Sequence, residues 1–148
     1  MKITKITPNF AVADVKQTVS FYQDILGFNL IMAVPETQDG VDQQLADNKE
    51  YVSAMVVKDN VEFFFQRIDS FKNDTAFENL FQSVFAQQQP VGASVSFYMY
   101  VEDIESLYNY VKSKNAETTE IHTTWYGMRE FYMKDNNGYV LGFAEKQA

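Results

Sequence analysis

Residues 10–30 have the sequence FAVADVKQTVSFYQDILGFNL, which contains signals for the start and the end of one helix. Asp14 is a good N-cap, because its short carboxylate can accept a hydrogen bond from a free N–H group of the first helical turn. Apolar residues follow at spacings typical of a helix packed on a core, and these are Val15, Val19, Phe21, Tyr22, Ile25 and Leu26. Gly27 suits the left-handed conformation that ends many helices. The stretch therefore predicts a strand, a helix and a second strand.

The rest of the first half is rich in strands. Alternation of apolar and polar residues, together with turn signals, predicts strands at 3–12, 28–34, 51–57 and 61–67. Pro8 indicates an edge position or a bulge in the first of them. The turn Lys58-Asp59-Asn60 joins the last two. The polar segment 36–50 is expected to be a mobile loop.

The second half repeats the order of the first. Val101-Glu102-Asp103-Ile104 matches Val12-Ala13-Asp14-Val15 at the junction of strand and helix, and the turn at 134–136 matches that at 58–60. The pattern predicts strands at 93–101, 117–126, 128–134 and 139–145, and a helix from Asp103 to Asn115. Before them, the spacing of apolar residues predicts a connecting helix over 75–88.

The duplicated order of elements predicts the fold class. It is α+β, with two βαβββ modules forming a curved mixed sheet that has helices outside and a concave cavity. We expect a single domain over 1–148, made of a first module (1–70), a helical connector (71–92) and a second module (93–148).

Composition excludes several classes of function. The 148 residues contain no Cys and one His, and the formal net charge is −8. Thiol nucleophiles, redox dithiols, zinc ribbons and metal sites with two or more His ligands from one chain are excluded. An acidic chain without a basic run is poorly suited to nucleic acids or acidic membrane surfaces. No apolar run approaches the 18 residues of a membrane span, so we expect a cytoplasmic protein.

Two segments resemble the vicinal-oxygen-chelate superfamily, which includes glyoxalases, dioxygenases and bleomycin resistance proteins. Residues 10–30 resemble its first strand and the LGF helix end. Residues 126–145, YGMREFYMKDNNGYVLGFAE, resemble the final hairpin of the bleomycin-resistance branch, although Tyr126 and Asn136 replace the Trp and Pro usual there. The resemblance spans nearly the whole chain in element order.

The resemblance places four metal ligands, and this chain lacks most of them. The corresponding positions are Thr7, Glu62, Ser96 and Gly142. Divalent metals need imidazole or carboxylate donors in such sites, and only Glu62 supplies one. We therefore expect neither metal nor cofactor, and no catalytic residue is assigned.

The resemblance then implies a metal-free protein of the bleomycin-resistance type. Such a protein would sequester an aromatic or amphipathic organic ligand in a concave pocket at a homodimer interface. One alternative is a lyase, dioxygenase or isomerase with a shifted metal site that uses Gln66 and Glu145. Another is a partner-binding regulatory module whose dimer surface is the function.

Strand alternation selects candidate ligand-binding residues. If the former metal positions face the cavity, then so do the alternate residues of the same strands, which are Glu62, Phe64, Gln66, Tyr98 and Tyr100. Trp125 and Tyr126 are expected at a rim loop or strand end, where aromatic rings can stack on a ligand. The structural alternatives are an ordinary sheet face, a core Trp125, and a Glu62 that pairs with Arg67 or Lys58.

Two further positions favour structural interpretations. His122 has no partner at a spacing that suggests a triad or a metal pair, so a structural or exposed role is favoured. Arg129-Glu130 lies on the penultimate predicted strand, where a cross-strand or intersubunit ion pair is favoured over a role in the site.

Overall fold

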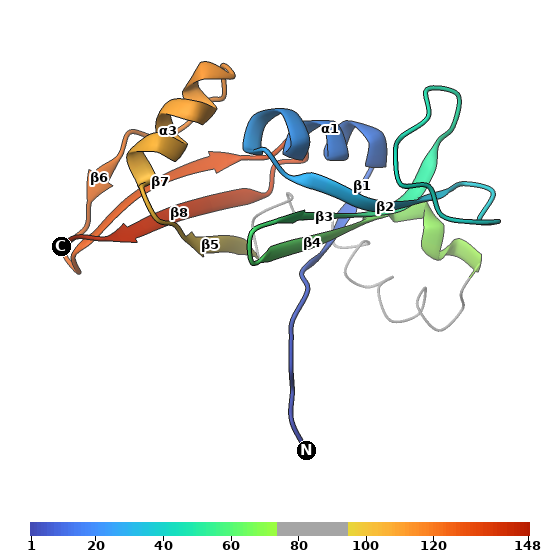
Figure 1. The fold of residues 1–148 in the computed structure, drawn as a ribbon, viewed down its shortest axis with the longest axis horizontal. Coiled ribbons are helices and arrows are strands. Elements are labelled where there is room, and N and C mark those ends of the chain that lie inside the picture. The colour runs from blue at the N-terminus through green and yellow to red at the C-terminus, as the bar shows by residue number, and fades with distance from the viewer. Residues whose placement is uncertain (74–94) are drawn as a thin grey trace. The chain divides into compact units, whose positions relative to one another are not determined.

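A computed structural model describes residues 1–73 and 95–148. The chain divides into two compact units, Met1–Gln87 and Gln88–Ala148, and each forms one four-stranded mixed sheet with a helix (Figure 1). The predicted α+β class with two βαβββ-like modules is confirmed. The helix predicted over 75–88 lies outside the described residues. Among those described, no helix is long and apolar enough to cross a membrane.

The first sheet has the strand order β1-β4-β3-β2. Its elements are β1 (Asn9–Val12), α1 (Val15–Leu26), β2 (Asn29–Pro35), β3 (Tyr51–Lys58), β4 (Val61–Arg67) and the short 3-10 helix η1 (Ile68–Asn73). The predicted ends of α1 are confirmed. The Asp14 carboxylate accepts a hydrogen bond from the backbone N–H of Gln17 at 2.9 Å, and Gly27 is left-handed with φ 74°.

Aromatic rings form the core between α1 and the first sheet. Their centroids lie 4.9–6.2 Å apart in the contacts among Phe10, Tyr22, Phe28, Phe63 and Phe65. Edge-to-face contacts at such distances add stability beyond the apolar area that the rings bury. Since Phe63 and Phe65 point to α1, the residues between and beside them on β4 face the other side of the sheet.

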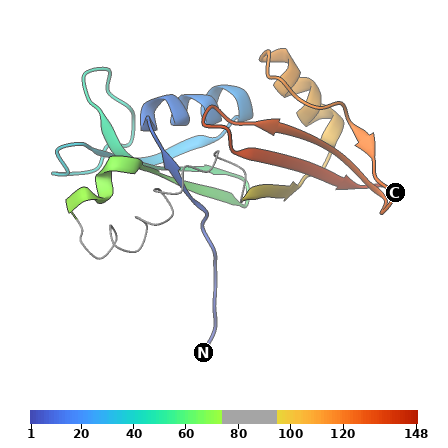
Figure 2. The same cartoon turned by 180° about the vertical axis from the view of Figure 1, so that it is seen from behind.

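The second sheet has the order β5-β8-β7-β6, and Figure 2 shows it from behind. Its elements are β5 (Ser96–Tyr100), α3 (Ile104–Ser113), β6 (His122–Thr123), β7 (Met128–Lys134) and β8 (Val140–Lys146). Phe131 and Phe143 stack at 5.2 Å, and the α3 residue Tyr108 meets Phe131 edge-on. These contacts define the face of the sheet that α3 covers.

Two predicted strands are shorter than expected. The first begins at Asn9, and the strand predicted over 117–126 is reduced to His122–Thr123. Thr118 still forms an isolated bridge with Met133, and the Thr119 N–H donates to the Tyr132 carbonyl at 2.9 Å. The Thr119 hydroxyl, and no backbone carbonyl, accepts the Tyr132 N–H at 2.8 Å. The regular ladder is therefore interrupted between Thr119 and β6.

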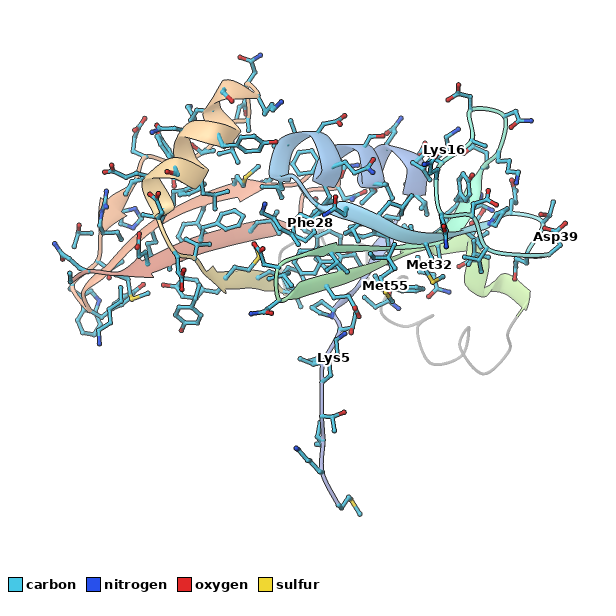
Figure 3. All side chains as sticks on the ribbon, in the orientation of Figure 1. Lys5, Lys16, Phe28, Met32, Asp39 and Met55 are labelled. Carbon is cyan, nitrogen blue, oxygen red and sulfur yellow. The ribbon has the colours of Figure 1, made fainter. Side chains whose placement is uncertain are left out.

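The loop at 36–50, which the sequence analysis expects to be mobile, has defined anchors. The Lys16 ammonium of α1 donates hydrogen bonds to the carbonyls of Ala46, Asp47 and Lys49 at 2.9–3.1 Å. Figure 3 shows Lys16 beside this loop. The Asp42 carboxylate also accepts from the Tyr51 hydroxyl at 2.8 Å. One ammonium with three donors thus satisfies three loop carbonyls.

Replacing Lys16 with Met should loosen this loop while α1 stays intact. Charged hydrogen bonds of this kind contribute about 1–3 kcal/mol, so we expect clearly faster amide exchange over residues 42–50. Hydrogen exchange by mass spectrometry measures this. Lys134→Met, a change at an exposed residue of β7, is the matched control. Equal exchange in the two variants would contradict the anchoring role.

Candidate functional site

Two rows of side chains cross the face of the second sheet that points away from α3. In one row, Gly142 of β8 pairs with Tyr98 of β5 on one side and with Tyr132 of β7 on the other. The next row consists of Tyr100, Ala144, Glu130 and His122. Because directly paired residues point to the same face, these rows bring tyrosines from two strands over two small residues of β8.

A buried carboxylate lies at the centre of this face. Glu130 is 3% exposed and accepts three tyrosine hydrogen bonds: from Tyr98 at 2.7 Å, Tyr126 at 3.1–3.2 Å and Tyr132 at 3.2 Å. The His122 Nε2 lies 3.5 Å from Glu130 Oε1. We call these five residues the Glu130 cluster. Buried carboxylates need such partners, and here four elements of the second unit supply them.

Two tyrosines of the cluster have raised pKa values. Burial and the hydrogen bond to Glu130 raise the pKa of Tyr98 well above its ordinary value. Burial, followed by the charge of Glu130, also raises the pKa of Tyr132. A phenolate beside a carboxylate would be a like-charge pair. Tyr98 and Tyr132 therefore keep their protons near neutral pH.

A tight turn positions the third tyrosine. Between β6 and β7 the Thr124 hydroxyl accepts the N–H of Met128 at 3.0 Å, and Gly127 adopts φ 82°. The turn places Tyr126 on Glu130 and leaves Trp125 95% exposed, with the two rings edge to face at 5.3 Å. Trp125 is thus exposed in a turn, and the core alternative for it is wrong.

The metal-ligand positions of the second module do not fit a metal. A Cβ atom added at Gly142 would lie 2.7 Å from Tyr132 Cε1 and 3.3 Å from Tyr98 Cδ2, so aromatic rings already occupy the space of a ligating side chain. Ser96 is exposed and offers only a neutral hydroxyl, which is a poor donor for a divalent ion. Nowhere in the described part of the chain do three His, Cys, Asp or Glu residues gather to hold a metal.

The first sheet brings the other two expected positions together. Glu62 accepts hydrogen bonds from the Lys5 ammonium at 2.8 Å and the Thr7 hydroxyl at 2.9 Å. The partner is therefore Lys5, and the structural alternative in which Glu62 pairs with Arg67 or Lys58 is wrong. The Lys5 ammonium, followed by the Thr7 hydroxyl, lowers the pKa of Glu62. A carboxylate and a neutral hydroxyl, already bound to each other, form no divalent site.

The predicted site residues fall into two groups, one in each unit. Phe64 and Gln66 lie on the same face of β4 as Glu62, paired in the ladder with Met55 and Ser53 of β3; Figure 3 shows Met55 on the side away from α1. Tyr98 and Tyr126 join the Glu130 cluster. Tyr100, 78% exposed, meets the Tyr98 ring edge-on at 5.5 Å. The predicted alternation is confirmed on both sheets.

Arg129, His122 and Glu145 each have a defined neighbour. Arg129 pairs with Glu105 of α3 at 2.6 Å, whereas Glu130 faces the opposite side of the sheet, so no cross-strand pair forms between charged residues of β7 and β8. His122 is exposed, in agreement with the expectation, and its ring lies near the Glu130 carboxylate on the neighbouring strand. Glu145 accepts the N–H groups of Asp103 and Ile104 at 3.1 and 2.8 Å.

The shifted metal site gains no support from these contacts. Glu145 caps the N-terminus of α3, where a carboxylate is favoured, and Gln66 accepts a hydrogen bond from the Asn9 amide at 3.4 Å. Both proposed donors already have a structural partner.

Glu130 and Tyr132 are the site residues that sequence reasoning missed. The signal was present in the last hairpin: the turn after Lys134 fixes the register of β7 against β8. Once Gly142 is taken as facing the cavity, its partner Tyr132 must face the same way, and so must Glu130 two residues earlier.

A family model for the Glyoxalase/Bleomycin resistance protein/Dioxygenase superfamily matches residues 3–143. The chain belongs to this superfamily. Comparison with curated protein sequences gives no match, so the assignment depends on the family model and the fold.

Several solved structures share the fold at low sequence identity. A glyoxalase-related enzyme from Clostridium phytofermentans is 18% identical, with a TM-score of 0.64 over 99% of this chain and 97% of that one. TioX from Micromonospora sp. ML1 is 13% identical, with a TM-score of 0.65 over 97% and 98% of the two chains. A putative glyoxalase family protein from Bacillus anthracis is 16% identical, with a TM-score of 0.61 over 99% of each chain.

Gly142→Ala should destabilise the second unit. The added methyl group would overlap the Tyr132 ring, and overpacking of this kind costs about 1–3 kcal/mol. Thermal or urea unfolding followed by circular dichroism measures the change. Gly40→Ala, where a Cβ would meet nothing within 4 Å, is the control. A melting temperature equal to that of the control would show that the rings do not close over Gly142.

Lys5→Met should raise the pKa of Glu62, and Thr7→Val should raise it less, because Lys5 contributes the larger effect. Since folding lowers this pKa, the contact stabilises the protein at neutral pH. That contribution is lost as the pH falls through the lowered value. An NMR titration of the Glu62 carboxyl, with Lys2→Met as control, measures the shifts. An unchanged pKa in Lys5→Met would contradict the ion pair.

Proposed function

We propose that this protein binds a small organic molecule, aromatic or amphipathic, without the help of a metal. The observation that carries the proposal is the Gly142 row, where Tyr98 and Tyr132 close over the position of a superfamily metal ligand. A site built this way offers aromatic rings and hydroxyl groups in place of a chelate. Flat, largely apolar molecules with a few polar atoms bind to such surfaces.

Exposed aromatic side chains beside this row support the proposal. Tyr98, Tyr100, Trp125 and Tyr126 are 38%, 78%, 95% and 51% exposed. Two edge-to-face pairs, Tyr98 with Tyr100 and Trp125 with Tyr126, hold the rings. Large rings left in water at one place usually mark a surface that binds something.

The proposal includes a homodimer that sequesters its ligand, as bleomycin resistance proteins do. The superfamily described by the family model contains such proteins. Light scattering on the purified protein tests the dimer, and a mass of one chain at working concentration would contradict that part alone.

A neutral flat probe, acridine at pH 8, should quench the fluorescence of Trp125, the only tryptophan. Trp125 itself is the reporter, so the test variant is Tyr98→Ala. Loss of one stacking aromatic costs about 0.5–1.5 kcal/mol, and we expect the dissociation constant to rise about twofold to twelvefold. A chelator should leave binding unchanged. Tyr110→Ala, a partly exposed aromatic residue of α3, is the matched control.

Two results would overturn this function. One is stoichiometric, tight binding of Ni, Zn, Mn or Fe, measured by metal analysis and by metal-dependent melting. The other is a protein that binds neither acridine nor any co-purifying small molecule in native mass spectrometry.

A further inference from the structure

We propose that the Glu130 cluster recognises an organic cation, such as an amidinium or a protonated amine, carried on a flat apolar body. The N–H groups of the cation donate hydrogen bonds to the cluster. This inference rests on the proposed function and names the class of ligand. It is carried by the hydrogen-bond geometry of Glu130 and by the charges around it.

The tyrosines of the cluster can only accept hydrogen bonds from a ligand. A tyrosine hydroxyl has one proton to donate and two lone pairs. Tyr98, Tyr126 and Tyr132 each direct that proton to a Glu130 oxygen, at 2.7–3.2 Å. Their unused capacity is therefore acceptor capacity. A ligand that offers N–H groups satisfies these oxygens, whereas a carbonyl or carboxylate would meet lone pairs.

The charge of Glu130 is not neutralised by a lysine or an arginine. Within residues 1–73 and 95–148, neither kind of side chain pairs with it, and the nearest basic group is the exposed His122 imidazole at 3.5 Å. The neighbouring Arg129 is on the opposite face, paired with Glu105. The three neutral hydroxyl donors stabilise the negative charge of Glu130 but do not cancel it. The surface above the cluster therefore attracts cations and repels anions.

The surrounding rings favour an organic cation over a small hydrated one. The face of an aromatic ring attracts an amidinium or ammonium group within about 6 Å of its centre. Tyr98 and Tyr126 are both hydrogen-bonded to Glu130 and partly exposed. Tyr100 and Trp125 extend the aromatic surface outward from them. A cation with an apolar body can thus contact the hydroxyl oxygens and the rings together, within the field of the buried carboxylate.

A hard metal ion is the competing occupant, since Glu, His and tyrosinate oxygens can bind ferric iron. Such binding needs phenolates, and the cluster opposes their formation. Burial and the nearby carboxylate raise the pKa of both Tyr98 and Tyr132. Iron is therefore an outcome that the experiment must detect, and the organic cation is the occupant that the geometry favours.

Four probes with one ring separate charge from hydrogen bonding: benzamidine, phenyltrimethylammonium, benzamide and benzoate. We expect benzamidine to bind most tightly by calorimetry on the full chain, with the quaternary cation weaker because it has no N–H group, and benzoate weakest. In Glu130→Gln the affinity for benzamidine should fall about tenfold or more, because the negative charge beneath the site is removed. Its preference over benzoate should largely disappear.

Two more variants keep the result interpretable. Glu105→Gln removes a carboxylate from α3 at the opposite face and should leave the preference unchanged. Tyr98→Phe keeps the ring but removes one acceptor oxygen, and should weaken benzamidine more than phenyltrimethylammonium. If Glu130→Gln fails to fold by circular dichroism, Tyr98→Phe decides the question.

The outcomes separate this inference from the proposed function. Two results would overturn the ligand class alone, provided that acridine binds. One is equal affinity for benzamidine and benzoate. The other is unchanged benzamidine binding in both Glu130→Gln and Tyr98→Phe. Failure of every probe, acridine included, would overturn both. Ferric iron that displaces benzamidine and produces a visible tyrosinate absorption band would replace the organic cation with a metal.

Discussion

A carboxylate that water hardly reaches must be hydrogen-bonded by the protein, because an unpaired buried charge costs several kcal/mol. Glu130 satisfies this requirement with three hydroxyl groups from two strands and a turn. The requirement fixes more than one side chain. It holds the β6–β7 turn over the sheet through Tyr126, and it orients the Tyr98 and Tyr132 rings toward each other across β8. The aromatic surface of the second unit depends on this one buried charge.

The small residues of β8 make that arrangement possible. Gly142 leaves a gap that the Tyr132 ring fills to 2.7 Å from the absent Cβ position, and Ala144 lies between Tyr100 and Glu130 in the next row. A ligating side chain at position 142 and two tyrosines above it exclude each other sterically. In this module a ligating side chain at position 142 and the aromatic surface are thus structural alternatives.

The sequence predicted the parts of the structure that depend on local patterns. Asp14 and Gly27 end α1 as their cap chemistry requires, and alternation placed Glu62, Phe64 and Gln66 opposite the buried Phe63 and Phe65. It failed where contacts are distant along the chain. Lys16 anchors a loop about thirty residues away by donating to three backbone carbonyls. A contact of this kind produces no periodic pattern in the sequence.

Glu130 was missed for a related reason. Next to Arg129, its charge suggested a cross-strand or intersubunit ion pair. Strand alternation puts the two residues on opposite faces, and the register of β7 against β8 places Glu130 beside Ala144, in the row next to Gly142. The neighbouring strand gave no help, because the Thr119 hydroxyl replaces a backbone acceptor there and interrupts the regular ladder. A side-chain hydroxyl that accepts a hydrogen bond in place of a backbone carbonyl does not change the hydropathy pattern, so this interruption could not be predicted from the sequence.

The two acidic residues on the open sheet faces differ in what they leave for a ligand. Glu62, the more prominent candidate in the sequence, is paired with an ammonium at 2.8 Å, so a cationic ligand would have to displace Lys5 to reach it. Glu130 is bound only by neutral hydroxyls and lies near one imidazole. A buried charge stabilised by neutral donors keeps its field, whereas a charge in an ion pair loses most of it to its partner. A cationic ligand is therefore expected to bind at the second sheet. Glu130 is less accessible than Glu62, but its charge is less neutralised.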